Sequence, residues 1–164
     1  MKKPVLKKAG EKPEDRTLAV SRSFKAPRQT VFDALTKPEI VRQWMLGPAG
    51  WSMTVCEIEL RLGGKYRYVW RQDSDGKTLG MGGIFRQVNA PERFAAYEQF
   101  DEPWYPGRSF VTTALAQKND ETVLFTTIQY ESKEIRDGVL KTAMLNGMAT
   151  HYDKLTELLK TGIA

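Results

Sequence analysis

The sequence predicts a single α+β domain in which a curved antiparallel sheet of about six to seven strands surrounds one long C-terminal helix. Short strand-like runs, separated by turn residues, follow one another between residues 51 and 130. Two helical segments that begin at prolines precede most of these runs. After residue 130 the apolar spacing changes from two to about 3.6 residues, which is the period of a helix. The predicted order is therefore one strand, two short helices, six strands and a terminal helix.

Prolines delimit the opening strand and the two short helices. Residues 18–24 are typical of an extended strand, and the strand should end before Pro27 because proline disfavours further pairing. Pro27 and Pro38 each suit the first position of a helix, where the N–H that proline lacks would have no partner. Gly47 and Pro48 then end the second helix. The two helices are thus expected between the first and second strands.

Turn residues separate the six later strands. The clearest turns are the segments 73–76 (Asp-Ser-Asp-Gly) and 118–121 (Lys-Asn-Asp-Glu). No proline occurs from Ser132 to Lys160, and we predict one long helix over this range. The strands are predicted near residues 51–60, 64–72, 79–89, 93–100, 109–117 and 122–130.

Composition and charge indicate one globular domain with a basic tail. With 164 residues, 41% of them hydrophobic and 27% charged, the chain is neither disordered nor fibrous in composition. The net charge of +5 could indicate a nucleic-acid partner. However, residues 1–16 hold six Lys or Arg and three acidic residues, so most of the excess charge lies there. We predict that residues 1–16 form a disordered tail, that residues 17–164 form the domain, and that no nucleic acid is bound.

Cys56 is the single cysteine, which excludes an intrachain disulfide and favours a reducing cytoplasm. The N-terminus lacks the apolar run of a signal peptide, and no segment approaches the length of a membrane span. We therefore expect a cytoplasmic protein.

Alternation within residues 64–71 indicates which face of the sheet is interior. Tyr66, Tyr68 and Trp70 occupy the even positions, and the odd positions are mostly cationic. Because neighbouring strand residues face opposite sides, these aromatic residues should point to the concave side. A single aromatic residue there would merely fill the core. Several Trp and Tyr side chains, whose polar atoms need partners, instead favour a cavity with apolar walls and a few hydrogen-bonding groups.

The terminal helix places the only histidine, His151, toward the sheet. At about 100° per residue, His151 falls near the middle of an apolar stripe. Two interpretations stay open: a hydrogen-bonding or titrating group in the cavity, or a core histidine satisfied by the backbone or a tyrosine. The stripe consists of Leu140, Met144, Gly147, Met148, Leu155 and Leu158, of which the methionines and the glycine would leave adaptable space.

Short motifs are spread in a specific order over residues 17–160. They are Ala26-Pro27, residues 31–35, Trp44, residues 47–51, residues 55–66, residues 82–85, residues 90–94, residues 146–148 and residues 152–155. Together they resemble the activator-of-heat-shock-ATPase homologues of the START-like, birch-pollen-allergen-like (SRPBCC) superfamily. This resemblance implies the helix-grip fold and implies no family-wide catalytic set. The sequence departs from the pattern at Glu59, where aspartate is common, and at His151, where a small polar residue is common.

Three functions follow from these observations. The first is the binding of a small hydrophobic or aromatic molecule in the cavity. The second is a polyketide cyclase-like or dehydratase-like enzyme without metal, in which His151 carries a proton with Glu98 or a tyrosine. The third, implied only by the resemblance, is a co-chaperone that activates a heat-shock ATPase; such relatives usually carry a further N-terminal domain. For the first function, the predicted lining is Trp44, Trp51, Tyr66, Tyr68, Trp70, Phe110, Met144, Met148 and His151.

No cofactor or metal is predicted. The sequence has no Gly-rich phosphate loop of the Walker type, and one histidine with one cysteine cannot form a typical structural zinc site. We expect Cys56 to be an inert buried cysteine rather than a nucleophile paired with His151. A homodimer formed through an exposed sheet edge stays open.

Overall fold

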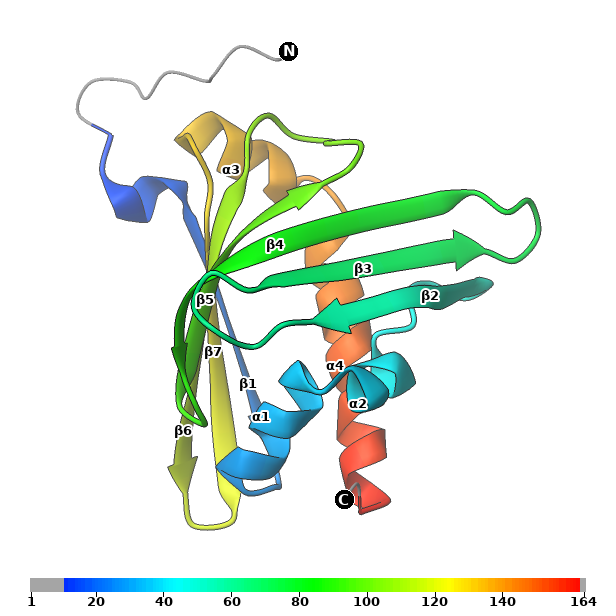
Figure 1. Cartoon of the computed structure of the whole chain (residues 1–164). Helices are drawn as coiled ribbons and strands as arrows, with labels where there is room; N and C mark the ends of the chain where they lie inside the picture. The colour runs from blue at the N-terminus through cyan, green and yellow to red at the C-terminus, as the bar shows by residue number, and fades with distance from the viewer. Residues whose placement is uncertain (1–10, 163–164) are drawn as a thin grey trace.

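The computed structural model describes residues 11–162 and shows the predicted α+β helix-grip fold (Figure 1). Seven strands form one antiparallel sheet in the order β1-β7-β6-β5-β4-β3-β2. None of the described helices has the length and apolar character needed to cross a bilayer. The elements are η1 (Pro13–Arg16), β1 (Thr17–Phe24), α1 (Arg28–Thr36), α2 (Pro38–Trp44), β2 (Trp51–Ile58), β3 (Lys65–Gln72), β4 (Thr78–Asn89), β5 (Arg93–Phe100), β6 (Ser109–Lys118), β7 (Glu121–Gln129), α3 (Lys133–Leu140) and α4 (Met144–Lys160).

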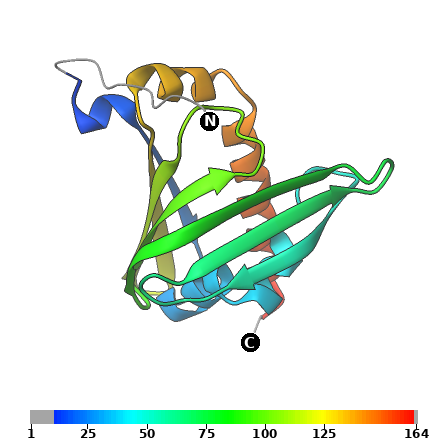
Figure 2. The same ribbon diagram turned by 45° about the horizontal axis from the view of Figure 1, so that its top comes forward.

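The sheet curls around α4. Strands β1, β6 and β7 form one wall, and β2, β3 and β4 cross in front of α4 at a steep angle to that wall (Figures 1 and 2). The pairing register shifts between Phe85 and Gln87 in β4 and between Met53 and Val55 in β2. Such bulges add an unpaired residue and bend the strand, which helps an antiparallel sheet to curve. The concave face and α4 therefore enclose the interior of the domain.

The predicted single helix over Ser132–Lys160 is wrong, because the chain forms two helices separated at residues 141–143. The hydroxyl of Thr142 donates to the carbonyl of Val139 at 2.6 Å and draws this carbonyl out of the regular helical pattern. The change of direction also removes Leu140 from the predicted inner stripe. Its side chain lies in α3 and is 45% exposed.

The predicted disordered tail contains an ordered stretch next to the domain. Pro13–Arg16 form the short helix η1, and the guanidinium of Arg16 donates to the carbonyl of Tyr130 at 3.2 Å. The carboxylate of Glu11 accepts a hydrogen bond from the backbone N–H of Lys133. These contacts join η1 to the start of α3. The remainder of the predicted tail, residues 1–10, lies outside the described residues.

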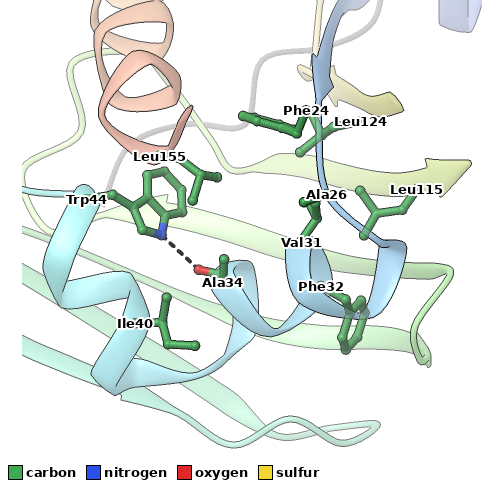
Figure 3. Packing of buried hydrophobic residues seen from close by; sticks show 10 residues of the cluster. All are labelled: Phe24, Ala26, Val31, Phe32, Ala34, Ile40, Trp44, Leu115, Leu124 and Leu155. Atoms are coloured by element: carbon green, nitrogen blue, oxygen red, sulfur yellow. Dashed lines mark hydrogen bonds between the residues drawn. The ribbon is translucent and has the colours of Figure 1, made fainter. Parts of the chain in front are cut away.

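One end of the domain is tightly packed. There α1 and α2 fill the space between the sheet and the C-terminal half of α4 (Figure 3). The indole N–H of Trp44 donates to the carbonyl of Ala34 at 2.8 Å, which satisfies one of the carbonyls that the end of α1 leaves unpaired. Trp44 is 1% exposed and Leu155, on α4, is fully buried. We call this cluster the packed end; it consists of Phe24, Ala26, Val31, Phe32, Ala34, Ile40, Trp44, Leu115, Leu124 and Leu155.

Candidate functional site

A cavity of about 400 Å³ lies between the concave face of the sheet and the N-terminal half of α4. Its walls come from strands β2 to β7, from the end of α1, from α2 and the loop after it, from the loop after β5, and from α4. Most of the wall is aromatic or aliphatic. Three lining residues, Pro48, Leu79 and Gly147, are also exposed on the surface, so the cavity reaches solvent between them. We call this region the hollow end.

The structure brings eight of the nine predicted lining residues together around this cavity. Phe110 is the exception. On β6 the residues that face the cavity are Ser109, Val111 and Thr113, so Phe110 points to the convex face, as strand parity requires. There its ring packs on Tyr97 at a centroid distance of 4.9 Å. The eight that line the cavity are Trp44, Trp51, Tyr66, Tyr68, Trp70, Met144, Met148 and His151.

The aromatic residues of β3 form a continuous wall, as their alternation predicted. The ring centroids of Tyr66 and Tyr68 are 5.3 Å apart, and those of Tyr68 and Trp70 are 6.0 Å apart. The indole N–H of Trp70 donates to the carbonyl of Met45 at 2.9 Å, which fixes this side chain against the end of α2. On the opposite face of β3, Arg67 forms an ion pair with Asp101. The wall is therefore held in place from both sides of the strand.

His151 faces the cavity and is held by the backbone of Gly47. Its Nε2 accepts a hydrogen bond from the Gly47 N–H at 3.0 Å, which requires the ring proton to be on Nδ1. The Nζ of Lys154 donates to the backbone carbonyl of Gly47 at 3.2 Å. Gly47 has a φ of +80°, a conformation that favours glycine. Burial, with a smaller contribution from Lys154, lowers the pKa of His151, so the ring is neutral at pH 7.

Of the two interpretations of His151, the structure therefore shows a ring that is satisfied by the backbone while one side still contacts the cavity. Cys56 is buried beside the cavity, opposite Tyr68 in the pairing of β2 with β3. It does not line the cavity, and burial raises the pKa of its thiol. Within residues 11–162, no group of three or more His, Cys, Asp or Glu side chains is placed to hold a metal ion.

Glu98, which the sequence suggested only as a partner of His151, lies in the wall of the cavity. The hydroxyl of Tyr66 donates to its Oε2 at 2.7 Å. Tyr66 on β3 pairs with Gly83 on β4, and Gly83 pairs with Glu98 on β5, so the three residues form one row across the sheet. A Cβ atom at Gly83 would overlap the ring of Tyr66. The missing side chain therefore allows the tyrosine to reach across β4 to the carboxylate.

Burial perturbs the acid–base properties of this pair. Desolvation raises the pKa of Glu98 to about 7, and the hydrogen bond from Tyr66 opposes the shift. Burial is the main cause, and the Glu98 carboxylate a smaller one, that raises the pKa of Tyr66 well above its ordinary value. A signal in the sequence could have found Glu98. On β5, Phe94, Ala96 and Phe100 face the cavity, and Glu98 is the one acidic residue in this alternating series.

The family model described as Activator of Hsp90 ATPase homolog 1-like protein matches residues 25–160 of the chain. The chain belongs to this family. No curated protein shows a significant sequence match to it.

Solved structures agree with this assignment. A protein from Rhodobacter sphaeroides is 30% identical and superposes with a TM-score of 0.84, over 92% of this chain and 96% of the other. A protein from Nitrosomonas europaea, 24% identical, has a TM-score of 0.78 over 92% and 97% of the two chains. An HSP90 activator from Plasmodium falciparum is 20% identical, with a TM-score of 0.53 over 70% and 72% of the chains. The last two similarities show a shared fold alone.

The family match includes every residue that lines the cavity, from Leu35 to Tyr152. The cavity is thus part of the family's domain and not of the N-terminal extension. The fold is compatible with a ligand-binding cavity.

Proposed function

We propose that this protein binds a small hydrophobic or aromatic molecule in the cavity at the hollow end. The observation that carries the proposal is a cavity of about 400 Å³ with an aromatic and aliphatic wall. Interiors of proteins are normally packed as densely as organic crystals, and apolar space left empty destabilises the fold. A space of this size with a few convergent polar groups is typical of a site for a small organic ligand.

The position of the cavity mouth supports the same proposal. Gly147 lies on α4 at the rim. Apart from its chain neighbours and its own helix backbone, no atom of residues 11–162 is within 4 Å of the place where its Cβ would be. Met144 and Met148 flank it, and their flexible side chains can adapt to the shape of a guest. A ligand could therefore enter beside α4 without unfolding the packed end.

The experiment is a fluorescence titration with Nile red, a neutral apolar dye, using the purified full chain. We expect saturable binding to the wild type. Gly147→Phe places a ring at the mouth, and should weaken binding by about tenfold or more, equivalent to about 1.4 kcal/mol. Ala149→Phe adds the same ring at an exposed position of α4 that does not line the cavity, and serves as the matched control.

Equal affinities for the two variants would contradict the proposal, since the dye would then be bound outside the cavity. Native mass spectrometry of the protein as purified provides a second readout. A co-purified small molecule that is lost in Gly147→Phe and retained in Ala149→Phe would reveal the chemical class of the ligand.

The two other functions receive less support. A cyclase-like enzyme in which His151 acts as a base needs the unprotonated ring nitrogen, whereas this nitrogen, Nε2, already accepts the Gly47 N–H. Activation of a heat-shock ATPase rests on the description of the family and on no particular contact in the described residues. It is tested by measuring the ATPase rate of a purified heat-shock chaperone with and without this protein.

A further inference from the structure

Among the described residues, the cavity wall contains one acidic side chain, Glu98, and no Lys or Arg. We propose that the ligand is a hydrophobic amine, whose protonated nitrogen is held by the carboxylate of Glu98 inside the aromatic wall. This inference rests on the proposed function, because it assigns a chemical class to the molecule that the cavity holds. It predicts selection for cations over neutral molecules and anions of the same shape.

The first argument is the balance of charge. Among the described residues, no Lys or Arg lines the cavity, and Glu98 is its acidic group. The nearest cation on α4, Lys154, is directed to the carbonyl of Gly47. His151 accepts a hydrogen bond and is neutral at pH 7. An anionic ligand would therefore meet a carboxylate without a compensating cation, whereas an ammonium group would find its partner there.

The second argument is the aromatic surface around that carboxylate. The centroid of the Tyr66 ring is 5.3 Å from that of Tyr68 and 5.2 Å from that of Phe85. Further along the wall, the rings of Phe100 and Tyr105 are 6.2 Å apart. The faces of aromatic rings carry partial negative charge and attract cations within about 6 Å, more strongly where water is excluded. These rings favour the cation that the carboxylate selects, and they also bury its apolar part.

The third argument is the geometry of the carboxylate. Tyr66 occupies Oε2 and orients the group. Within residues 11–162, Tyr66 is the one hydrogen-bond partner of the Glu98 side chain, which leaves Oε1 free to accept from a ligand. Because Gly83 has no side chain, no atom of β4 separates the Tyr66 hydroxyl from Glu98. The site thus contains one oriented acceptor in an otherwise apolar wall.

The proposal predicts how binding depends on pH. The titratable groups that interact electrostatically with Glu98 are the tyrosines of β3, of the loop after β5, of the residue after β7 and of α4. His151 lines the same cavity, where its Nε2 accepts the Gly47 N–H. Burial raises the pKa of each of these tyrosines, so they stay neutral near pH 7: Tyr66, Tyr68, Tyr105, Tyr130 and Tyr152. Glu98, with a pKa of about 7, is then the group that changes charge between pH 6 and 8. Affinity for an amine should rise over this range, and binding should release a proton.

The experiment uses three probes with one ring system: 2-naphthylmethylamine, 2-naphthalenemethanol and 2-naphthoate. Calorimetric titration of the full chain near pH 6 and pH 8 gives the affinities. Repeating the titration in buffers of different ionisation enthalpy gives the number of protons released. Near pH 8 we expect the amine to bind about tenfold more tightly than the alcohol and the naphthoate more weakly than both. Near pH 6 the preference for the amine should shrink.

Glu98→Gln preserves the shape and the acceptor for Tyr66 while removing the charge. In this variant the roughly tenfold preference for the amine over the alcohol should fall to the small part that the aromatic rings supply, and proton release should disappear. Equal affinities of the wild type for amine and alcohol near pH 8 would overturn the inference, as would an undiminished preference in Glu98→Gln. If Nile red binds and the amine does not, this inference fails and the proposed function stands. If neither binds, the proposed function itself fails.

Discussion

The two ends of α4 contact the rest of the domain in different ways. In its C-terminal half, Leu155 is fully buried between α1, α2 and the sheet at the packed end. In its N-terminal half, Met144 and Met148 are only half-buried, and Gly147 is exposed at the rim of the cavity. The same helix therefore anchors the fold at one end and borders a hollow at the other. Leu155 is thus expected to affect stability more than the residues at the rim of the cavity do, and four substitutions at the two ends test this difference.

The largest expected effect is at the packed end. Leu155→Ala should lower the free energy of unfolding by about 2–5 kcal/mol, because it removes buried methyl groups and leaves space that the neighbours cannot fill. Met148→Ala, the matched substitution at the hollow end, should cost less than about 1 kcal/mol because its side chain borders a space that is already open. Urea denaturation followed by circular dichroism measures both. Equal losses would show that the two ends are packed alike.

An intermediate effect is expected at Glu98. Folding raises the pKa of this carboxyl from 4.5 to about 7, so the folded state binds the proton more tightly than the unfolded chain does. Stability from this group is full below pH 4.5 and declines as the pH rises through 7. Glu98→Gln removes the decline and should stabilise the protein on the order of 2 kcal/mol near pH 8, with little effect near pH 4.5. A gain that is the same at both pH values would contradict this assignment.

The smallest effect is expected at Gly147. Because the space around its Cβ position is open, Gly147→Ala should raise the free energy of unfolding by about 0.5–1 kcal/mol through helix propensity alone. Thermal denaturation measures this gain, and Nile red affinity should stay within about twofold of the wild type because a single methyl group does not close the mouth. A loss of stability would mean that the rim is more tightly packed than the structure shows.

Much of the fold follows from local patterns in the sequence. Prolines mark the two short helices, and turn residues mark the strands near the bounds that the structure shows. The alternation of Tyr66, Tyr68 and Trp70 correctly identified the concave face, because strand parity depends on the backbone alone. The same rule, applied from Ser109 onward, would have excluded Phe110. The break between α3 and α4 escaped prediction because no proline marks it; there the backbone N–H and the hydroxyl of Thr142 both donate to the carbonyl of Val139.

The candidate site was harder to predict than the fold. The lining of the cavity could be assembled from strand parity and the helix stripe, whereas the partners of its polar groups could not. Glu98 meets Tyr66 across β4, and His151 meets Gly47 from a distant part of the chain. Such contacts depend on how the sheet curls and on the tilt of α4, which no local spacing encodes. Strand parity could thus place Glu98 in the cavity wall, whereas its hydrogen bond to Tyr66 could not be predicted from the sequence.

The missing side chain at Gly83 has a consequence for the evolution of the family. A relative with any larger residue at this position cannot keep the tyrosine directed across β4, so its carboxylate would lose the bond that orients it. Under the proposed function, Tyr66, Gly83 and Glu98 therefore form one unit. Relatives that lack one of the three are then expected to lack the others and to bind a different class of ligand.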